Sequence, residues 1–393
     1  MSAIIWKWTV ICLCIGCLTG CWDKIEVNQL AIAGLVGTDT VPETHEQIVY
    51  YQIINPGAFA SQMGSNVKSP VYTYKVQGPS KGELGLKSSE ILPRRLFTDH
   101  YQSHIISERY AREGLRPFLN YYERQYNRRS SLLLLVTDSP LADVMMTYIP
   151  LERLQGRTLR SLVNNVSEST GRVSRKSRVK DLVENMETSM ITILPLVSLS
   201  GSKPSLTTDR YEQINANQKN LILTGGAVFK HDRMVGKMGL KQAGYYNLLK
   251  GEASSFFESV EMDGSTVDLA ASKVKVHKSL SMVSGKPIWM VTLDIRLSII
   301  NNEQMKDLTT DNIAKIKQQF NNQIIEKSTE LYLESCEKQW DLFGLENKIK
   351  YKRGKEWDYL RNQKNSWTQT KLQIKVNSTV NDIGEIINPY KGE

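Results

Sequence analysis

The distribution of cysteines places the strongest restriction on how this 393-residue chain can fold. Four of the five cysteines lie within the first 21 residues, and Cys336 is the only one in the rest of the chain. A body with one cysteine cannot form an internal disulfide, so an apolar core must stabilise it. A chain of this length can bury enough apolar surface for that, and the length predicts two or three domains.

The first twenty residues have the layout of a secretory signal peptide. The cation Lys7 is followed by the uncharged stretch 8–18 and then by small residues. A helix that crosses the hydrocarbon core of a membrane needs about 20 apolar residues, which is more than this stretch provides. We therefore expect residues 1–20 to be a signal peptide that is removed from the mature protein.

The end of this segment, Leu18-Thr19-Gly20-Cys21, resembles the lipobox of bacterial lipoproteins. The resemblance implies that the Cys21 thiol receives diacylglycerol, that the signal is cut just before Cys21, and that the new N-terminus is acylated, as with palmitate. The alternative is an ordinary signal peptide that happens to contain cysteines. Cys17, after Cys14-Ile15-Gly16, is a poorer match, and Cys21 alone has the full pattern. Two or three acyl chains hold a protein stably on a membrane, whereas one binds only marginally.

The chain is moderately basic, with a formal net charge of +9, from which Lys7 is lost with the signal peptide. A basic balance suits an anionic lipid surface. The charges are interspersed rather than massed in the runs typical of nucleic-acid binding, so nucleic acid is not an expected partner. The longest apolar run after the signal peptide is 132–136, far shorter than a membrane span. We expect the body to fold outside the bilayer.

The first part of the body alternates between strand and helix patterns. Residues 84–92 and 115–122 carry apolar side chains at helical spacing. Elsewhere apolar or β-branched residues alternate between turn signals, or form short buried runs. The predicted strands are 29–38, 46–54, 70–77, 104–107 and 132–136. Together these elements predict a mixed sheet with helices packed on it.

A change of composition then predicts a domain boundary. Residues 140–192 have helical spacing, interrupted by the polar and basic stretch 167–177, which predicts a loop. The stretch 198–220 is poor in large apolar residues and rich in turn formers, so we place the boundary there. The expected organisation is a signal peptide at 1–20, an N-terminal α/β region at 21–200 with a helical subdomain around 140–192, and a C-terminal α+β region at 221–393.

The C-terminal region combines long strands with a long helix. The helix is expected from about Asn312 to Trp340, with Thr310 or Asp311 as its N-cap. The predicted strands are a hairpin over 221–238 that turns at His231-Asp232, an antiparallel pair over 267–283 and 287–300, and a final strand at 372–376. The predicted class is α+β: a multi-domain mixed α/β body with antiparallel-rich sheets and a long helix in its C-terminal half.

One arrangement suggests a metal site. Two histidines four residues apart on a helix, with a nearby glutamate, could ligate zinc, and His100, His104 and Glu108 have that spacing. The strand predicted at 104–107 breaks the helical face that such a site needs. We therefore interpret these histidines as structural, and we expect neither a metal nor another cofactor.

A set of charged residues lies in the same part of the chain. Its i, i+4 pairs mix attraction with repulsion. It is either a partner-binding face or a solvated helix side whose favourable pairs contribute about 0.2–0.5 kcal/mol each. The sequence leaves both interpretations open. The set is Glu108, Arg109, Arg112, Glu113, Arg116, Glu123 and Arg124.

The remaining motifs do not indicate an enzyme. Gly225-Gly226 and Gly34-Leu35-Val36-Gly37 fit neither a phosphate-binding loop nor a dinucleotide fingerprint, and tight turns explain them. The chain has no Gly-x-Ser-x-Gly sequence. Cys336 is expected inside the long helix without a histidine nearby in the sequence. No catalytic residue is predicted.

Several strings resemble the Ger(x)C family of spore germination lipoproteins, the C subunits of nutrient germinant receptors. The mature start, Cys21-Trp22-Asp23-Lys24-Ile25-Glu26 followed by Leu30-Ala31, matches the typical opening of this family. Asn120-Tyr121-Tyr122 and Leu345 depart locally from its pattern. The other matching strings are Arg94-Arg95-Leu96-Phe97 with His100 and His104, Ser107-Glu108, Gly225-Gly226-Ala227-Val228-Phe229-Lys230, and Trp340-Asp341-Leu342-Phe343-Gly344.

The resemblance implies a non-enzymatic receptor subunit that is needed when nutrients trigger spore germination. It implies a lipid anchor at Cys21 on the outer face of the spore inner membrane, work beside a multi-spanning A subunit and a transporter-like B subunit, and a three-domain α+β fold. The alternative is a membrane-anchored lipoprotein that captures small ligands for a transporter, with a cleft around 198–220. A cell-wall hydrolase is a third class, but no pair of carboxylates or metal cluster can be assigned to it.

Overall fold

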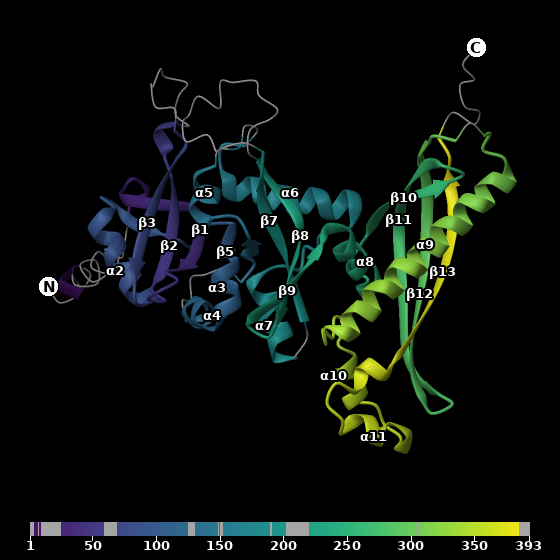
Figure 1. Ribbon diagram of the computed structural model, residues 1–393. Helices are drawn as coiled ribbons and strands as arrows, with labels where there is room; N and C mark the ends of the chain where they lie inside the picture. Colours follow the sequence, from purple (N-terminus) through teal and green to yellow (C-terminus); the bar gives the residue numbers. More distant parts are fainter. Residues whose placement is uncertain are drawn as a thin grey trace, which may run out of the picture.

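The computed structural model describes residues 4–6, 8, 25–58, 69–124, 130–147, 149, 152–188, 191–201, 220–304 and 306–384. The molecule is elongated, with a large sheet and its helices at one end and a smaller sheet with the long helix α9 (Thr310–Glu337) at the other (Figure 1). Cys21 and most of the predicted signal peptide lie outside the described residues.

The large sheet, in the described parts of the chain, has nine strands in the order β3-β2-β1-β5-β6-β7-β8-β9, with β4 beside the start of β1. The central strands β1, β5, β6 and β7 are parallel, and antiparallel partners flank them on both sides. All residues of β5 and β6 are buried, because helices cover both faces. The strands are β1 (Leu30–Thr40), β2 (Gln47–Ile54), β3 (Val71–Gly78), β4 (Arg95–Phe97), β5 (Ser103–Ser107), β6 (Leu133–Thr137), β7 (Ile191–Ser200), β8 (Asn220–Lys230) and β9 (Arg233–Gly239).

Two apolar layers join this sheet to its helices. Along β1 and β5, Val36 and Ile106 point into one layer while Leu35 and Ile105 point into the other. This division follows from the alternation of side chains along a strand. The first layer is covered by α2 (Lys81–Ile91), α3 (Glu108–Glu113), α4 (Arg116–Glu123) and α7 (Val179–Glu187), and the second by α5 (Leu141–Met146) and α6 (Gln155–Thr170).

The smaller sheet has the order β10-β11-β12-β13, and α9 covers one of its faces (Figure 1). Ile316, Phe320 and Ile324 recur every four residues on α9 and are fully buried in one cluster with Trp289 and Leu293 of β12. The remaining elements are β10 (Ser255–Met262), β11 (Ser265–Val283), β12 (Lys286–Asn302), β13 (Lys371–Asp382), α8 (Leu240–Lys250), α10 (Leu345–Lys350), α11 (Asp358–Arg361), and the 3-10 turns η1 (Val27–Gln29), η2 (Pro56–Ala58), η5 (Lys355–Trp357) and η6 (Ser366–Gln369).

The predicted α+β class, with antiparallel-rich sheets and a long helix in the C-terminal half, is confirmed. The hairpin that turns at His231-Asp232 is confirmed as β8 and β9, and the long antiparallel pair as β11 and β12. Strands β7 and β8 flank the predicted boundary at 198–220 and pair with each other, so both belong to the large sheet. The division into regions 21–200 and 221–393 stays a prediction.

Two predicted boundaries are wrong. Helix α6 continues to Thr170, inside the predicted loop 167–177, and ends at Gly171, whose φ of 65° is the left-handed conformation that favours glycine after a helix. The long helix begins earlier than predicted, because the Thr309 hydroxyl accepts the backbone N–H of Asn312 and is the N-cap in place of Thr310 or Asp311.

Several further elements, among them β7, α8 and β10, were not predicted. Strand β7 is mostly apolar and largely buried, a pattern that periodicity alone does not distinguish from a buried helix. Helix α8 lies between the two sheets and buries all seven of its residues from Ala243 to Leu249, so it has no polar face and no amphipathic pattern. Among the described residues, no helix is both long and apolar enough to cross a membrane.

Close packing of α6 on β1 gives the first testable prediction. A Cβ atom on Gly156 would lie 2.2 Å from the backbone oxygen of Gly34, which cannot move without moving β1. We expect Gly156→Ala to lower the free energy of unfolding by about 1–3 kcal/mol, measured by urea unfolding. Gly85 on α2 is the matched control, because nothing lies within 4 Å of its added Cβ. Gly85→Ala should stabilise the helix slightly, and equal effects of the two changes would contradict the packing argument.

Candidate functional site

His104 is the centre of a buried polar group in the large sheet. The His104 Nε2 atom lies 2.8 Å from Thr38 Oγ1, and its Nδ1 atom lies 3.1 Å from the Tyr101 hydroxyl. The ring also packs against Phe118 of α4, with 4.7 Å between the ring centroids. The side chain is 3% exposed. His104 on β5 therefore contacts β1 through the Thr38 hydroxyl and α4 through the Phe118 ring.

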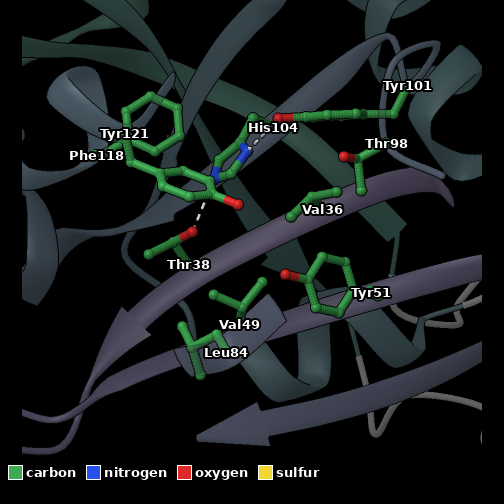
Figure 2. A pocket seen from close by; sticks show the side chains of 10 residues that line it. All are labelled: Val36, Thr38, Val49, Tyr51, Leu84, Thr98, Tyr101, His104, Phe118 and Tyr121. Atoms are coloured by element: carbon green, nitrogen blue, oxygen red, sulfur yellow. Dashed lines mark hydrogen bonds between the residues drawn. The ribbon is translucent and has the colours of Figure 1, made fainter. Parts of the chain in front are cut away.

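A small cavity opens beside this group (Figure 2). Aromatic rings, hydroxyls and aliphatic side chains line it: Val36, Thr38, Val49, Tyr51, Leu84, Thr98, Tyr101, His104, Phe118 and Tyr121. The centre of a water molecule can reach about 30 Å³ of this cavity. One water needs about 10–15 Å³ on the same measure, so the space is small. The cavity lies away from 198–220, where the ligand-capture alternative places its cleft, and most of that stretch is outside the described residues.

The charged set around helix α3 is held by other parts of the fold. Lys237 Nζ on β9 lies 2.6 Å from Glu108 Oε2 on α3 and 3.2 Å from Asp138 Oδ2 after β6. Glu108 also pairs with Arg112, one helical turn further on, at 2.7 Å. Lys237 therefore joins two carboxylates from different elements at the edge of the sheet.

A second group of contacts fixes α3 to β1. Arg109 Nη2 lies 2.7 Å from Asp39 Oδ2, and the Ser107 hydroxyl donates to the same carboxylate. The Thr40 hydroxyl donates to Glu113 at 3.0 Å. These pairs favour a structural role for most of the charged set. Its last two members, Glu123 and Arg124, are exposed at the end of α4.

The pKa values around Lys237 follow from these contacts. Burial alone would raise the pKa of Glu108. The hydrogen bonds from Lys237 and Arg112 have a larger, opposite effect, so the pKa of Glu108 lies below its ordinary value. Burial likewise opposes ionisation of Asp138, but hydrogen bonds from Ser198 and Lys237 hold its pKa low. Burial disfavours the Lys237 ammonium, yet bonds to both carboxylates raise its pKa above the ordinary value. The charged forms of all three groups are stabilised.

These shifts predict a pH-dependent loss of stability in a Lys237→Met variant. A carboxylate whose pKa is lowered by folding stabilises the protein above its unfolded pKa, near 4, and that contribution disappears as the pH falls through the folded value. We expect Lys237→Met to cost about 1 kcal/mol at pH 7 and less at pH 3, measured by urea unfolding. Lys306→Met, which removes an exposed pair with Asp263, is the control. An equal cost of Lys237→Met at both pH values would contradict this account.

The proposed zinc ligands do not form a metal site. His104 lies on β5 and Glu108 starts α3, whereas His100 is exposed and contacts the edge of Phe97, with 5.1 Å between the rings. In the part of the chain that the structure describes, no group of three or more His, Cys, Asp or Glu side chains could hold a metal ion. The predicted structural role of His104 agrees with its buried contacts.

Cys336 and the glycine pair are also explained by packing. Cys336 is half-buried near the end of α9, and burial raises the pKa of its thiol, which lowers its reactivity. The prediction that tight turns explain the glycines is wrong, because Gly225-Gly226 lie within β8, and Gly34 and Gly37 lie within β1. A Cβ on Gly225 would lie 2.1 Å from the Met238 backbone oxygen, so the pairing of β8 with β9 requires glycine there. Cys21 lies outside the described residues.

The sequence did not reveal the residues that form ion pairs with the charged set. Asp39, Asp138 and Lys237 are each the centre of a contact between elements that lie far apart in the chain. A single acid just after each of the predicted strands 29–38 and 132–136, Asp39 and Asp138, was the available signal. A lone charge does not reveal its partner, because pairing depends on the order of strands.

Known spore germination proteins match nearly the whole chain. Residues 23–199 match the family model of the spore germination protein N-terminal domain, and residues 224–384 match the model of the spore germination B3/GerAC-like C-terminal domain. The chain is 22% identical to spore germination protein KC of Bacillus subtilis (strain 168), over 95% of this chain and 94% of that protein. It is 27% identical to the putative spore germination protein YfkR of the same organism, over 60% of this chain and 58% of that one.

A solved structure has the same fold. The crystal structure of the GerBC protein superposes with a TM-score of 0.56 and 13% identity, covering 88% of this chain and 96% of that one. The two family models, the full-length relative and this fold all indicate the same family. The chain therefore belongs to the GerAC family of spore germination proteins, as a non-enzymatic C subunit of a germinant receptor.

Proposed function

We propose that this receptor subunit is held by lipid on Cys21 at the outer face of the spore inner membrane, where it works beside the A and B membrane subunits. The observation that carries the proposal is the lipobox-like Leu18-Thr19-Gly20-Cys21 placed directly before the folded body. Within the described residues of that body, no helix could cross a membrane. The proposal assigns the attachment to the N-terminal segment.

Lipid attachment has a direct physical effect on assembly. Each buried methylene contributes about 0.8 kcal/mol, so the two or three acyl chains of a processed lipoprotein hold it on the bilayer. Confinement to the membrane surface raises the effective concentration of the body beside membrane-spanning partners. A modest contact between the subunits is then enough for stable association.

The fold supports a role in protein contacts rather than in chemistry. The charged residues of α3 contact the sheet, the described cavity holds only water-sized groups, and the thiol of Cys336 has a raised pKa. The separate matches of 23–199 and 224–384 support the proposed division into two regions, each of which offers its own surface.

The anchoring step can be tested on the mature protein itself. Protein purified from spore membranes is digested, and the mass of its N-terminal peptide is measured. We expect a peptide that begins at Cys21 and carries diacylglycerol and an N-acyl chain, and we expect intact protein to partition into the detergent phase. An unmodified Cys21, or a mature chain that still contains residues 1–20, would refute anchoring by this cysteine.

A further inference from the structure

A group of exposed apolar side chains surrounds the place where the N-terminal segment enters the fold. Val27 is 70% exposed, Tyr72 50%, Ile91 48% and Ile25 38%. Arg94 and Arg95 are exposed beside them in the sequence. We call these six residues the tether-end patch.

The sheet topology brings the members of the patch to one end. Leu30, three residues after Val27, pairs with Arg95 at the start of β4. Tyr72 pairs with Ile53, which in turn pairs with Ala33 of β1. Neighbouring strands lie about 4.8 Å apart, so Tyr72 is about 10 Å from Ala33, which lies near the start of β1.

Helix α2 ends at the same place. Its last residue is Ile91, and four residues later Arg95 is already paired with β1. Leu92 between them is buried and fixes the end of the helix on the sheet. Figure 1 shows α2 at the end of the molecule that lies farthest from β10–β13 and α9. The patch is therefore at one extremity of the elongated body.

The distance to the proposed anchor is short. Cys21 precedes Ile25 by four residues, which span at most about 14 Å when fully extended. If the acyl chains on Cys21 lie in the bilayer, this end of the body cannot move farther than that from the headgroups. The C-terminal half has no such restriction.

The chemistry of the patch suits a lipid headgroup region. Aliphatic side chains enter the boundary between headgroups and acyl chains, tyrosine is enriched at that level, and arginine places its charge among the phosphates. Glu26 and Glu90 are exposed in the same segments, so the local charge is nearly balanced. Insertion of apolar side chains is accordingly the main contribution to the free energy of membrane binding. The two arginines add selectivity for anionic lipid.

We propose that the tether-end patch rests on the bilayer surface, so that Ile25, Val27, Tyr72 and Ile91 enter the headgroup region while Arg94 and Arg95 contact anionic lipid. The proposal rests on the proposed anchoring through Cys21. It fixes an orientation: the end of the large sheet with α2 faces the membrane, and the β10–β13 sheet with α9 is held away from it.

The test uses the full lipidated chain with Cys336→Ser, which removes the thiol that remains in the mature protein once Cys21 carries lipid. Val27→Cys and Ile91→Cys report on the patch, and Leu333→Cys, on an exposed site of α9, is the matched control. Each cysteine carries an environment-sensitive fluorophore. The protein is reconstituted on vesicles of phosphatidylcholine and phosphatidylglycerol that contain a lipid with a nitroxide at the headgroup.

We expect the labels at positions 27 and 91 to shift to the blue and to lose most of their emission to the nitroxide, while the label at 333 does neither. Protein that floats with the vesicles but leaves labels 27 and 91 unquenched would overturn the proposal while anchoring stands. A blue shift without quenching indicates a protein contact and also overturns it. Protein that does not float with the vesicles would refute anchoring itself.

A second variant isolates the arginines. Arg94→Glu with Arg95→Glu should reduce the quenching of the label at position 91, because acidic side chains are repelled by phosphatidylglycerol. Arg353→Glu with Lys355→Glu makes the same change of charge on exposed residues of the C-terminal half and should leave the quenching unchanged. Equal quenching in both variants would show that the arginines do not contact lipid.

Discussion

Spores that carry Cys21→Ala as their only form of this protein are expected to lose most of their response to nutrient, with germination slower by about tenfold or more. Release from the membrane removes the high effective concentration that confinement provides, and this term alone can exceed tenfold. The measurement is the loss of optical density of purified spores after addition of nutrient. The amount of the protein in each spore preparation is measured by immunoblot.

The neighbouring cysteine provides a matched control for this variant. Cys17 lies four residues earlier in the same segment and lacks the full lipobox pattern. Cys17→Ala should leave anchoring and germination unchanged. Normal germination of Cys21→Ala spores whose protein is fully released from the membrane would refute the requirement for the anchor.

Phe320→Ala is expected to lower the free energy of unfolding of the C-terminal part by about 3–5 kcal/mol. The ring is fully buried under α9, in the same cluster as Ile316, Ile324 and Trp289. Removal of a ring at a site fixed between a helix and a sheet leaves a cavity that the backbone cannot close. Trp289 and Trp367 lie in this cluster, so tryptophan fluorescence during urea unfolding reports the loss directly.

Leu333 on the same helix is the control for Phe320. Its side chain is 56% exposed, so Leu333→Ala should change the free energy of unfolding by no more than about 0.5 kcal/mol. A loss of less than 1 kcal/mol in Phe320→Ala would contradict the role given to α9 as the cover of the smaller sheet.

The elements that could be predicted from the sequence are those whose pattern is local. Strand β12 alternates between buried and less buried positions over most of its length, and α9 repeats its apolar residues at helical spacing, so their periods are visible in the chain. Elements buried on all sides have no such contrast. Helix α8 and strand β7 are buried over most of their length because they lie between other layers, and this position follows from the tertiary fold.

The contacts of the candidate site could not be predicted for a related reason. Asp39 and Arg109 are 70 residues apart, and Lys237 and Asp138 are 99 apart. Their pairing depends on β5 and β6 lying between β1 and β7 in the sheet, an order that periodicity does not encode. His104 was identified as a structural residue from the strand pattern around it, but its partners Thr38 and Tyr101 were visible only in the fold.

The family could be identified from the sequence because the resemblance lies in short, contiguous sequence motifs. The opening after Cys21, the central hairpin and the segment Trp340-Asp341-Leu342-Phe343-Gly344 are contiguous in the sequence. In the structure, Leu342 and Phe343 are buried in the core of the smaller sheet, and Asp341 accepts the backbone N–H groups of Leu345 and Glu346 at the start of α10. The string therefore encodes a turn that fixes α10 to the core, and burial raises the pKa of Asp341 there.

The most direct test of a lipid-anchored receptor subunit is affinity capture of the intact, tagged protein from spore membranes, followed by identification of the proteins that purify with it. We predict that the A and B membrane subunits of the receptor are recovered with the wild-type protein, and that both fall sharply when Cys21→Ala replaces it at equal abundance. Recovery of the lipidated, membrane-bound protein without either subunit would contradict the account.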